Sequence, residues 1–130
     1  MMYYSVAIDG PAGAGKSTMA RRAAQTLGFV YVDTGAIYRA VACAVLRAGV
    51  QPEDGAAVAA LLPQMRMRLS WTPDGVQHVF LNEEDLTAQL RRPEVSEAAS
   101  KVSALPAVRQ FLLDTQRDVA KTHNVIMDGR

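Results

Sequence analysis

Nine residues near the start of the chain constrain its fold more than any other stretch. They fit the phosphate-binding pattern G-x-x-x-x-G-K-[ST] and consist of Gly10, Pro11, Ala12, Gly13, Ala14, Gly15, Lys16, Ser17 and Thr18. Residues 4–9, with an apolar run at residues 6–8, predict a buried strand that leads into them, and residues 16–27 have the apolar spacing of a helix. A strand, a glycine-rich loop and a helix in this order indicate a site for a polyphosphate.

The residue types of this loop suit the chemistry of such a site. Gly10, Gly13 and Gly15 allow the backbone to approach an anion closely and to turn its N–H groups inward. Lys16 supplies a positive charge for the β and γ phosphates, and the hydroxyl of Ser17 can bind Mg²⁺. The helix that follows adds unpaired N–H groups and the positive end of its dipole. A glycine-rich turn without a ligand is the alternative, but it does not explain the lysine and the hydroxyl.

Length and composition favour a single soluble domain. The chain has 130 residues, enough for one modest core and too few for most two-domain enzymes. Its 14 Lys and Arg against 13 Asp and Glu give a net charge of +1, without the positive excess of a nucleic-acid surface. We find neither a signal peptide nor a membrane-length apolar run, and therefore expect a cytoplasmic protein that binds no membrane. The single cysteine, Cys43, is expected to be a small buried residue.

Most of the chain alternates predicted strands and helices. Further core strands are expected at residues 29–32 and 124–128. Helices are expected at residues 34–47, with Asp33 or Thr34 as the cap, at residues 52–62, with a stop near Pro63, and at residues 93–102 and 106–119. This alternation predicts an α/β fold with a doubly wound parallel sheet. Because only three core strands are visible, we expect the sheet to be incomplete, with one edge and one face poorly covered.

One segment breaks this alternation with a different period. Apolar residues alternate with polar ones along residues 67–71, and Pro73-Asp74-Gly75 predicts a turn. A returning strand is expected at residues 76–81, and a third short strand at residues 85–87. The sequence therefore predicts a small antiparallel sheet inserted into the parallel fold.

Three motifs follow the carboxyl ends of the predicted parallel strands. The phosphate-binding loop follows the first strand, Asp33-Thr34 the second, and Asp128-Gly129-Arg130 the third. Ligands of doubly wound sheets gather at this edge, so we expect the three motifs to face one cleft. An acid in the position of Asp128 usually belongs to the magnesium shell or orients another site residue. The alternative for Asp128 is a helix cap or a turn residue.

Thr34, Tyr38 and Arg39 are candidates for the other half of the site. Residues 34 and 38 share one face of the predicted helix, and Arg39 lies next to that face. A hydroxyl, an aromatic ring and a guanidinium grouped in this way can hold a base and a phosphate. The alternatives are an exposed helix arginine for Arg39 and a tyrosine at the edge of the core for Tyr38.

Three stretches together resemble the hallmark motifs of bacterial cytidylate kinases. They are Ile8-Asp-Gly-Pro-Ala-Gly-Ala-Gly-Lys-Ser-Thr18, Asp33-Thr-Gly-Ala-Ile-Tyr-Arg39 and Ile126-Met-Asp-Gly-Arg130. The short strands predicted between Met67 and Thr87 also resemble the extra sheet in the monophosphate-binding region of that family. Adenylate, shikimate and dephospho-coenzyme A kinases share the first stretch but not the second, so the second and third make the resemblance specific.

The resemblance implies a P-loop enzyme that transfers the γ-phosphoryl group of ATP to CMP or dCMP with Mg²⁺, giving ADP and CDP or dCDP. It implies that Lys16 and Ser17 serve the ATP phosphates and the metal. It further implies that the acceptor is held by Thr34, Tyr38, Arg39, Arg109 and Arg130. Asp128 would order Arg130, the acceptor phosphate or the waters of the metal, so Lys16, Asp128 and Arg130 are the candidates for catalytic residues.

The resemblance also divides the chain into regions and leaves two alternatives open. Residues 1–33 and 114–130 would form part of the P-loop core, and residues 34–113 the monophosphate-binding region, with its small sheet near residues 66–90. The further core strands, arginine-rich lid and C-terminal helix of the family lie outside this sequence. The chain is expected to be a monomer. The alternatives are a fragment that binds nucleotide phosphates without catalysis and a different P-loop kinase for a small metabolite.

Overall fold

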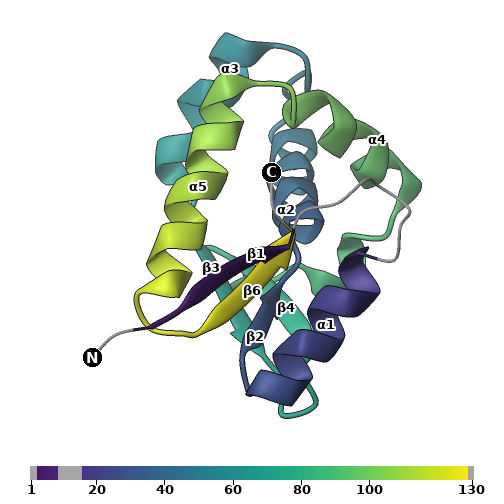
Figure 1. Ribbon diagram of the computed structural model, residues 1–130. Coiled ribbons are helices and arrows are strands. Elements are labelled where there is room, and N and C mark those ends of the chain that lie inside the picture. Colours follow the sequence, from purple (N-terminus) through teal and green to yellow (C-terminus); the bar gives the residue numbers. More distant parts are fainter. Residues whose placement is uncertain (1–2, 9–15, 129–130) are drawn as a thin grey trace.

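The computed structural model describes residues 3–8 and 16–128 of the chain, without the side chains of residues 16, 17 and 128. Within these residues the chain forms five α-helices and two three-stranded sheets (Figure 1). In that view α5 is at the left of the parallel strands and α1 is at the right. The mixed α/β class predicted from the sequence is therefore confirmed.

The first sheet is parallel and has the strand order β1–β6–β2. Its strands are β1 (Ser5–Ile8), β2 (Val30–Val32) and β6 (Val125–Asp128). In the central strand β6, Asp128 is opposite Ile8 of β1, and Met127 is opposite Val32 of β2. The carboxyl ends of all three strands therefore lie side by side, as the order of the motifs predicts.

The continuous apolar runs of β2 and β6 arise because both faces of this part of the sheet are covered. Val125 packs into the main core, whereas its neighbour Ile126 packs against α1 (Lys16–Leu27). Helix α1 has the predicted bounds, and it ends because Gly28 adopts the left-handed conformation at φ +71°.

Helix α2 (Thr34–Arg47) lies at the centre of the main core and also has the predicted bounds. Asp33 caps its first turn by accepting a hydrogen bond from the Ala36 N–H at 3.2 Å. Helix α2 packs against α4 (Pro93–Val102) and α5 (Pro106–Ala120), each of which begins with a proline.

Helix α3 (Gly55–Leu61) extends the main core beside α5. The predicted start at residue 52 is too early, because Asp54 caps the helix by accepting a hydrogen bond from the Ala57 N–H. A 3₁₀ turn at Leu62–Gln64 continues the helix past the predicted stop near Pro63. Cys43 of α2 is buried, which confirms the expectation of a small core residue.

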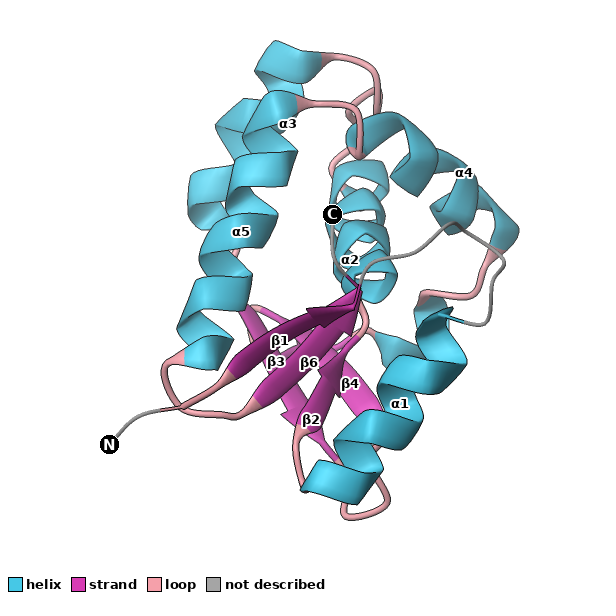
Figure 2. Cartoon of the chain, viewed as in Figure 1, coloured by secondary structure: helices cyan, strands magenta, loops and turns pink. Residues whose placement is uncertain are grey.

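The second sheet is the antiparallel insertion that the change of period predicts (Figure 2). Its strands are β3 (Met67–Trp71), β4 (Gln77–Leu81) and β5 (Glu84–Asp85). β4 begins one residue later than expected because Val76 belongs to the turn, where its N–H donates to the Thr72 hydroxyl at 3.0 Å. Leu69, Val79 and Leu81 of this sheet are buried in the same core as α2.

The prediction of a third short strand at residues 85–87 is wrong in its extent. β5 ends at Asp85, and a 3₁₀ turn follows at Thr87–Gln89. The Asp85 carboxylate accepts hydrogen bonds from the N–H and the hydroxyl of Thr87, at 3.0 and 2.6 Å. This local side-chain pairing competes with strand geometry and turns the chain.

The predicted starts of the three core strands, at Tyr4, Phe29 and Asn124, each lie one residue too early. The Phe29 N–H bonds back to Ala24 and completes the end of α1. Asn124 forms a loop contact instead, because its side-chain oxygen accepts a hydrogen bond from the Tyr4 N–H at 2.8 Å. Such local hydrogen bonds shift element ends without changing the pattern of the core.

The outer edge of β1 is poorly covered, as expected for an incomplete sheet. Among the described residues, β1 pairs only with β6, and Val6 is 39% exposed. The prediction that the first strand is buried is therefore wrong, since Ser5 and Ala7 are exposed as well. Leu113 of α5 is exposed as well. The boundary at residue 114 falls inside α5, and the division of the chain into two regions stays a prediction.

The hydrogen bonds of the turn after β5 predict a low pKa for Asp85, which a titration can measure. Hydrogen bonds from the Thr87 hydroxyl and N–H, followed by the contact with His78, lower the pKa of Asp85 to about 2. Since this folded-state pKa lies below the ordinary value, the turn stabilises the fold above that value and loses this contribution as the pH falls toward 2. In a ¹³C NMR titration, Thr87→Val should raise the pKa of Asp85, whereas Thr87→Ser should leave it low.

Asp74 provides an internal control in the same titration, since the Thr72 hydroxyl lowers its pKa independently of Thr87. A Thr87→Val variant in which the pKa of Asp85 stays near 2 would show that another group holds the carboxylate ionised.

Candidate functional site

The candidate site lies at the carboxyl edge of the parallel sheet. The loop of residues 9–15, with the predicted strand end Asp9, lies outside the described residues, and so do Gly129 and Arg130. For Lys16, Ser17 and Asp128 only the backbone is described: Lys16 begins α1, and Asp128 ends β6. The proposed roles of these side chains stay predictions.

The backbone nevertheless gives α1 the orientation that a phosphate site needs. Helix α1 packs along β6 and β2, and its end connects through Gly28 to the start of β2 at Val30. The start of α1 therefore lies toward the opposite edge, where the strands end. The unpaired N–H groups and the positive dipole end of a helix favour an anion at this position.

Asp33 and Arg39 form an ion pair over the first turn of α2. The Asp33 carboxylate caps the helix with one oxygen, and its other oxygen lies 3.8 Å from an Arg39 guanidinium nitrogen. Both side chains are about one-third exposed, so the guanidinium is anchored and still accessible. The sequence predicts Arg39 as a site residue, but it assigns no role to the Asp33 side chain beyond that of a possible cap.

Gly35 makes this close approach possible. A Cβ at this position would lie 3.1 Å from an Arg39 guanidinium nitrogen and 3.3 Å from an Asp33 carboxylate oxygen. Both separations are tighter than ordinary contacts, so a larger residue would displace the guanidinium. Gly35 is therefore the residue type that leaves room for the Arg39 guanidinium beside Asp33.

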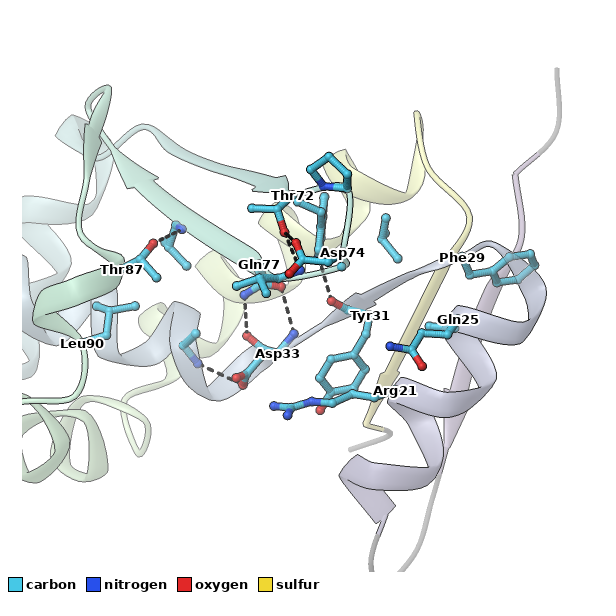
Figure 3. A pocket seen from close by; sticks show the side chains of 18 of the residues that line it. Arg21, Gln25, Phe29, Tyr31, Asp33, Thr72, Asp74, Gln77, Thr87 and Leu90 are labelled. Atoms are coloured by element: carbon cyan, nitrogen blue, oxygen red, sulfur yellow. Dashed lines mark hydrogen bonds between the residues drawn. The ribbon is translucent and has the colours of Figure 1, made fainter.

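A pocket of about 900 Å³, here called the large pocket, lies between α1, β2 and the β3–β4 hairpin (Figure 3). Arg21 and Gln25 of α1 line one side, and Trp71 and Gln77 of the hairpin line another. The Arg21 guanidinium lies over the Tyr31 ring, 5.3 Å from its centroid. Asp33 and Arg39 also line this pocket.

A second pocket of about 340 Å³, here called the small pocket, lies between α2 and α4. Tyr38 and Arg39 line it from α2, together with Gly35. On the other side it is lined by Ala99 and by three serines: Ser96 and Ser100 belong to α4, and Ser103 is the residue that caps its end. Arg39 lines both pockets and therefore lies between them.

Sequence reasoning missed the three serines of the small pocket. Their spacing of four and three residues places them on one helix face, which is a signal that the sequence contains. That spacing alone does not say which helix lies opposite. Two of the hydroxyls bond within α4: Ser100 donates to the Ser96 carbonyl at 3.3 Å, and Ser103 donates to the Ser100 carbonyl at 3.0 Å.

The remaining acceptor candidates are not gathered in either pocket. Thr34 is half-buried at the start of α2 and lines neither of them. Arg109 is exposed in the first turn of α5 and also lines neither. The structure thus brings Tyr38 and Arg39 together, and the roles of Thr34 and Arg109 stay predictions.

Among the side chains that the structure describes, no group of three or more His, Cys, Asp or Glu is arranged to hold a metal ion. None of the helices in the described part of the chain is both long and apolar enough to cross a membrane.

Comparison with known proteins identifies a family that this chain matches over almost its whole length. A family model described as cytidylate kinase matches residues 6–130. The cytidylate kinases of Symbiobacterium thermophilum and Exiguobacterium sp. are each 50% identical over 125 residues, which cover 96% of this chain and 55% of theirs. The cytidylate kinase of Caldicellulosiruptor bescii is 45% identical over 130 residues, covering 100% of this chain and 57% of its own. The chain thus spans about half the length of these relatives.

The contact at Gly35 predicts that stability and site geometry can be separated. Gly35→Ala should change the free energy of unfolding by less than about 0.5 kcal/mol, because the gain from alanine in the unfolded chain and in the helix is opposed by its Cβ, which would lie 3.3 Å from the Asp33 oxygen that caps α2. The added methyl group should also displace the Arg39 guanidinium, which a shift of the Arg39 Nε–H signal in NMR spectra would report.

Gly55→Ala is a matched control at the start of α3. A Cβ at Gly55 would meet only Leu105, at an ordinary 3.5 Å, so this variant should gain stability without a shift at Arg39. An unchanged Arg39 signal in Gly35→Ala would contradict the role of Gly35 as space for the guanidinium.

Proposed function

Because the chain belongs to the cytidylate kinase family, we propose that this protein transfers the γ-phosphoryl group of ATP to CMP or dCMP. The products are ADP and CDP or dCDP. The observation that carries the proposal is the register of the parallel sheet. It brings the ends of the three strands to one edge, where the phosphate motif, Asp33 and the Asp128 motif follow them. This arrangement suits an in-line transfer, in which the protein positions two nucleotides and neutralises charge.

The donor side of the proposed site is the loop of residues 10–18 and the start of α1. The loop N–H groups and Lys16 would hold the ATP phosphates, and the Ser17 hydroxyl would hold Mg²⁺. Mg²⁺ would neutralise part of the negative charge of the ATP phosphates during the transfer. Support comes from the orientation of α1, whose amino end lies toward the strand ends.

The acceptor side of the proposed site lies around Arg39. Its guanidinium can form paired, charge-assisted hydrogen bonds with the phosphate of CMP, and Arg130 would add a second cation. The small pocket beside it offers the Tyr38 ring and the serine hydroxyls of α4 to the nucleoside. Thr34 and Arg109 would complete the contacts with the acceptor, as the resemblance implies.

Asp128 would connect the two halves of the proposed site. It ends the central strand opposite Ile8, the last described residue before the phosphate-binding loop. From this position its carboxylate would order Arg130, the acceptor phosphate or the waters of the metal. We assign Asp128 a positioning task between donor and acceptor, with Lys16 and Arg130 contacting the phosphates themselves.

One alternative belongs to a different class: the 130 residues bind nucleotide phosphates without catalysis. The observation that favours it is the exposed outer edge of β1, the strand that leads into the phosphate-binding loop, where Val6 is open to solvent. A P-loop kinase for another small metabolite is less well supported, since the matched relatives are named cytidylate kinases.

A coupled ADP-release assay with CMP, dCMP, UMP and AMP tests the proposal. We expect CMP and dCMP to react fastest, and Arg39→Ala to raise the KM for CMP about 10- to 100-fold while the KM for ATP changes little, because a charge-assisted contact is lost. Lys16→Ala should instead lower kcat with every acceptor. Arg117→Ala, which changes an exposed arginine of α5, is the control for an unspecific loss of charge.

Two outcomes of this assay would decide against the proposal. Equal rates with AMP and CMP would contradict the assignment to cytidine nucleotides. Binding of ATP and CMP without ADP release would favour the non-catalytic alternative for these 130 residues.

A further inference from the structure

Side chains, rather than another strand, cover the outer edge of β2 among the described residues. The Val30 N–H bonds toward β6, where it donates to the Asn124 carbonyl at 2.9 Å. Since the backbone groups of a strand alternate in direction, those of Tyr31 and Asp33 point to the outer edge. An edge of this kind needs partners for its N–H and C=O groups.

The β3–β4 hairpin supplies these partners through two side chains (Figure 3). The Gln77 amide makes two hydrogen bonds with the backbone of one residue: its oxygen accepts from the Asp33 N–H at 3.0 Å, and its NH₂ donates to the Asp33 carbonyl at 3.2 Å. The Trp71 indole N–H donates to the Tyr31 carbonyl at 2.9 Å. The Gln77 side-chain amide thus makes the pair of hydrogen bonds that the backbone of a neighbouring strand would make.

The two side chains act from one position of the hairpin. Trp71 and Gln77 are directly opposite each other in the β3–β4 register, so three hydrogen bonds connect one cross-strand pair to the end of β2. The Trp71 ring also packs against the His123 ring, with the centroids 5.2 Å apart. The inserted sheet is therefore fixed to the junction between β2 and α2.

This junction holds the arginine that the proposed function assigns to the acceptor phosphate. Both the N–H and the C=O of Asp33 are hydrogen-bonded to Gln77, so the backbone from which the Asp33 carboxylate projects is restrained. That carboxylate caps α2 and lies 3.8 Å from the Arg39 guanidinium. A chain of contacts runs from Gln77 through Asp33 to Arg39.

We propose that Gln77 is a positioning residue, which orients Arg39 for the phosphate of the acceptor nucleotide by holding the backbone of Asp33. The inference rests on the proposed function, because that function assigns Arg39 to this phosphate. The inserted sheet then contributes to the site through Asp33 and Arg39, although no side chain of β3 or β4 needs to touch the nucleotide.

Isothermal titration of the 130-residue chain with CMP and with cytidine tests this inference, since cytidine lacks the phosphate. Gln77→Met keeps the length of the side chain and removes both hydrogen bonds with Asp33. We expect it to weaken CMP binding about three- to tenfold, in the lower part of the range of coupling between contacting residues because Gln77 acts through Asp33, and to leave cytidine binding unchanged. Hydrogen exchange at the Asp33 amide should become faster in the same variant.

His78→Met is the matched control for a loosened hairpin. It introduces the same side chain at the next position of β4, on the opposite face, and removes the contact with Asp85 at 2.9 Å. CMP binding, cytidine binding and Asp33 amide exchange should all stay as in the unaltered chain. Arg39→Ala is the reference for full loss of the phosphate contact and should weaken CMP binding more than Gln77→Met does.

The outcomes separate this inference from the proposed function. If Arg39→Ala weakens CMP binding and Gln77→Met does not, or if Gln77→Met weakens CMP and cytidine equally, the positioning role of Gln77 is wrong and the proposed function stands. If the unaltered chain does not bind CMP, or if Arg39→Ala leaves CMP binding unchanged, the acceptor site is wrong and the inference fails with it. Asp33 amide exchange reports the hydrogen bonds of Gln77 in every case.

Discussion

The candidate site depends on the pairing of β6 between β1 and β2. These strands are far apart in the sequence, yet their register pairs Ile8 with Asp128 and Val32 with Met127 at one edge of the sheet. The pairing is stabilised on both faces, because Val125 enters the main core and Ile126 packs under α1. Buried apolar contacts of β6 thus determine where three polar motifs meet, and the chemistry of the site follows from the packing of the sheet.

A second constraint is the junction between β2 and α2. Asp33 ends the strand, caps the helix, pairs with Arg39 and is bound through its backbone by Gln77. Gly35 leaves the space that the guanidinium occupies. One carboxylate therefore stabilises the helix and orients a cation, so a change of Asp33 itself is expected to lower both stability and acceptor binding.

Much of the fold follows from the sequence because its signals are local. The bounds of α1, α2 and α4 agree with the apolar spacing, the cap at Asp33 and the proline at position 93. The end of β5 could not be predicted, since it depends on the Asp85 carboxylate turning back to Thr87. The serines facing Tyr38 and the amide of Gln77 were also beyond local reasoning, because their roles arise only when elements distant in sequence pack together.

The central claim is that the acceptor nucleotide binds around Arg39, between the start of α2 and the serine face of α4. A crystal structure of the protein with CMP and a non-hydrolysable ATP analogue tests it most directly. The account predicts the CMP phosphate against the Arg39 guanidinium and the nucleoside in the pocket lined by Tyr38 and Ser100. CMP bound elsewhere, for example between α1 and the β3–β4 hairpin without contact to Arg39, would contradict it.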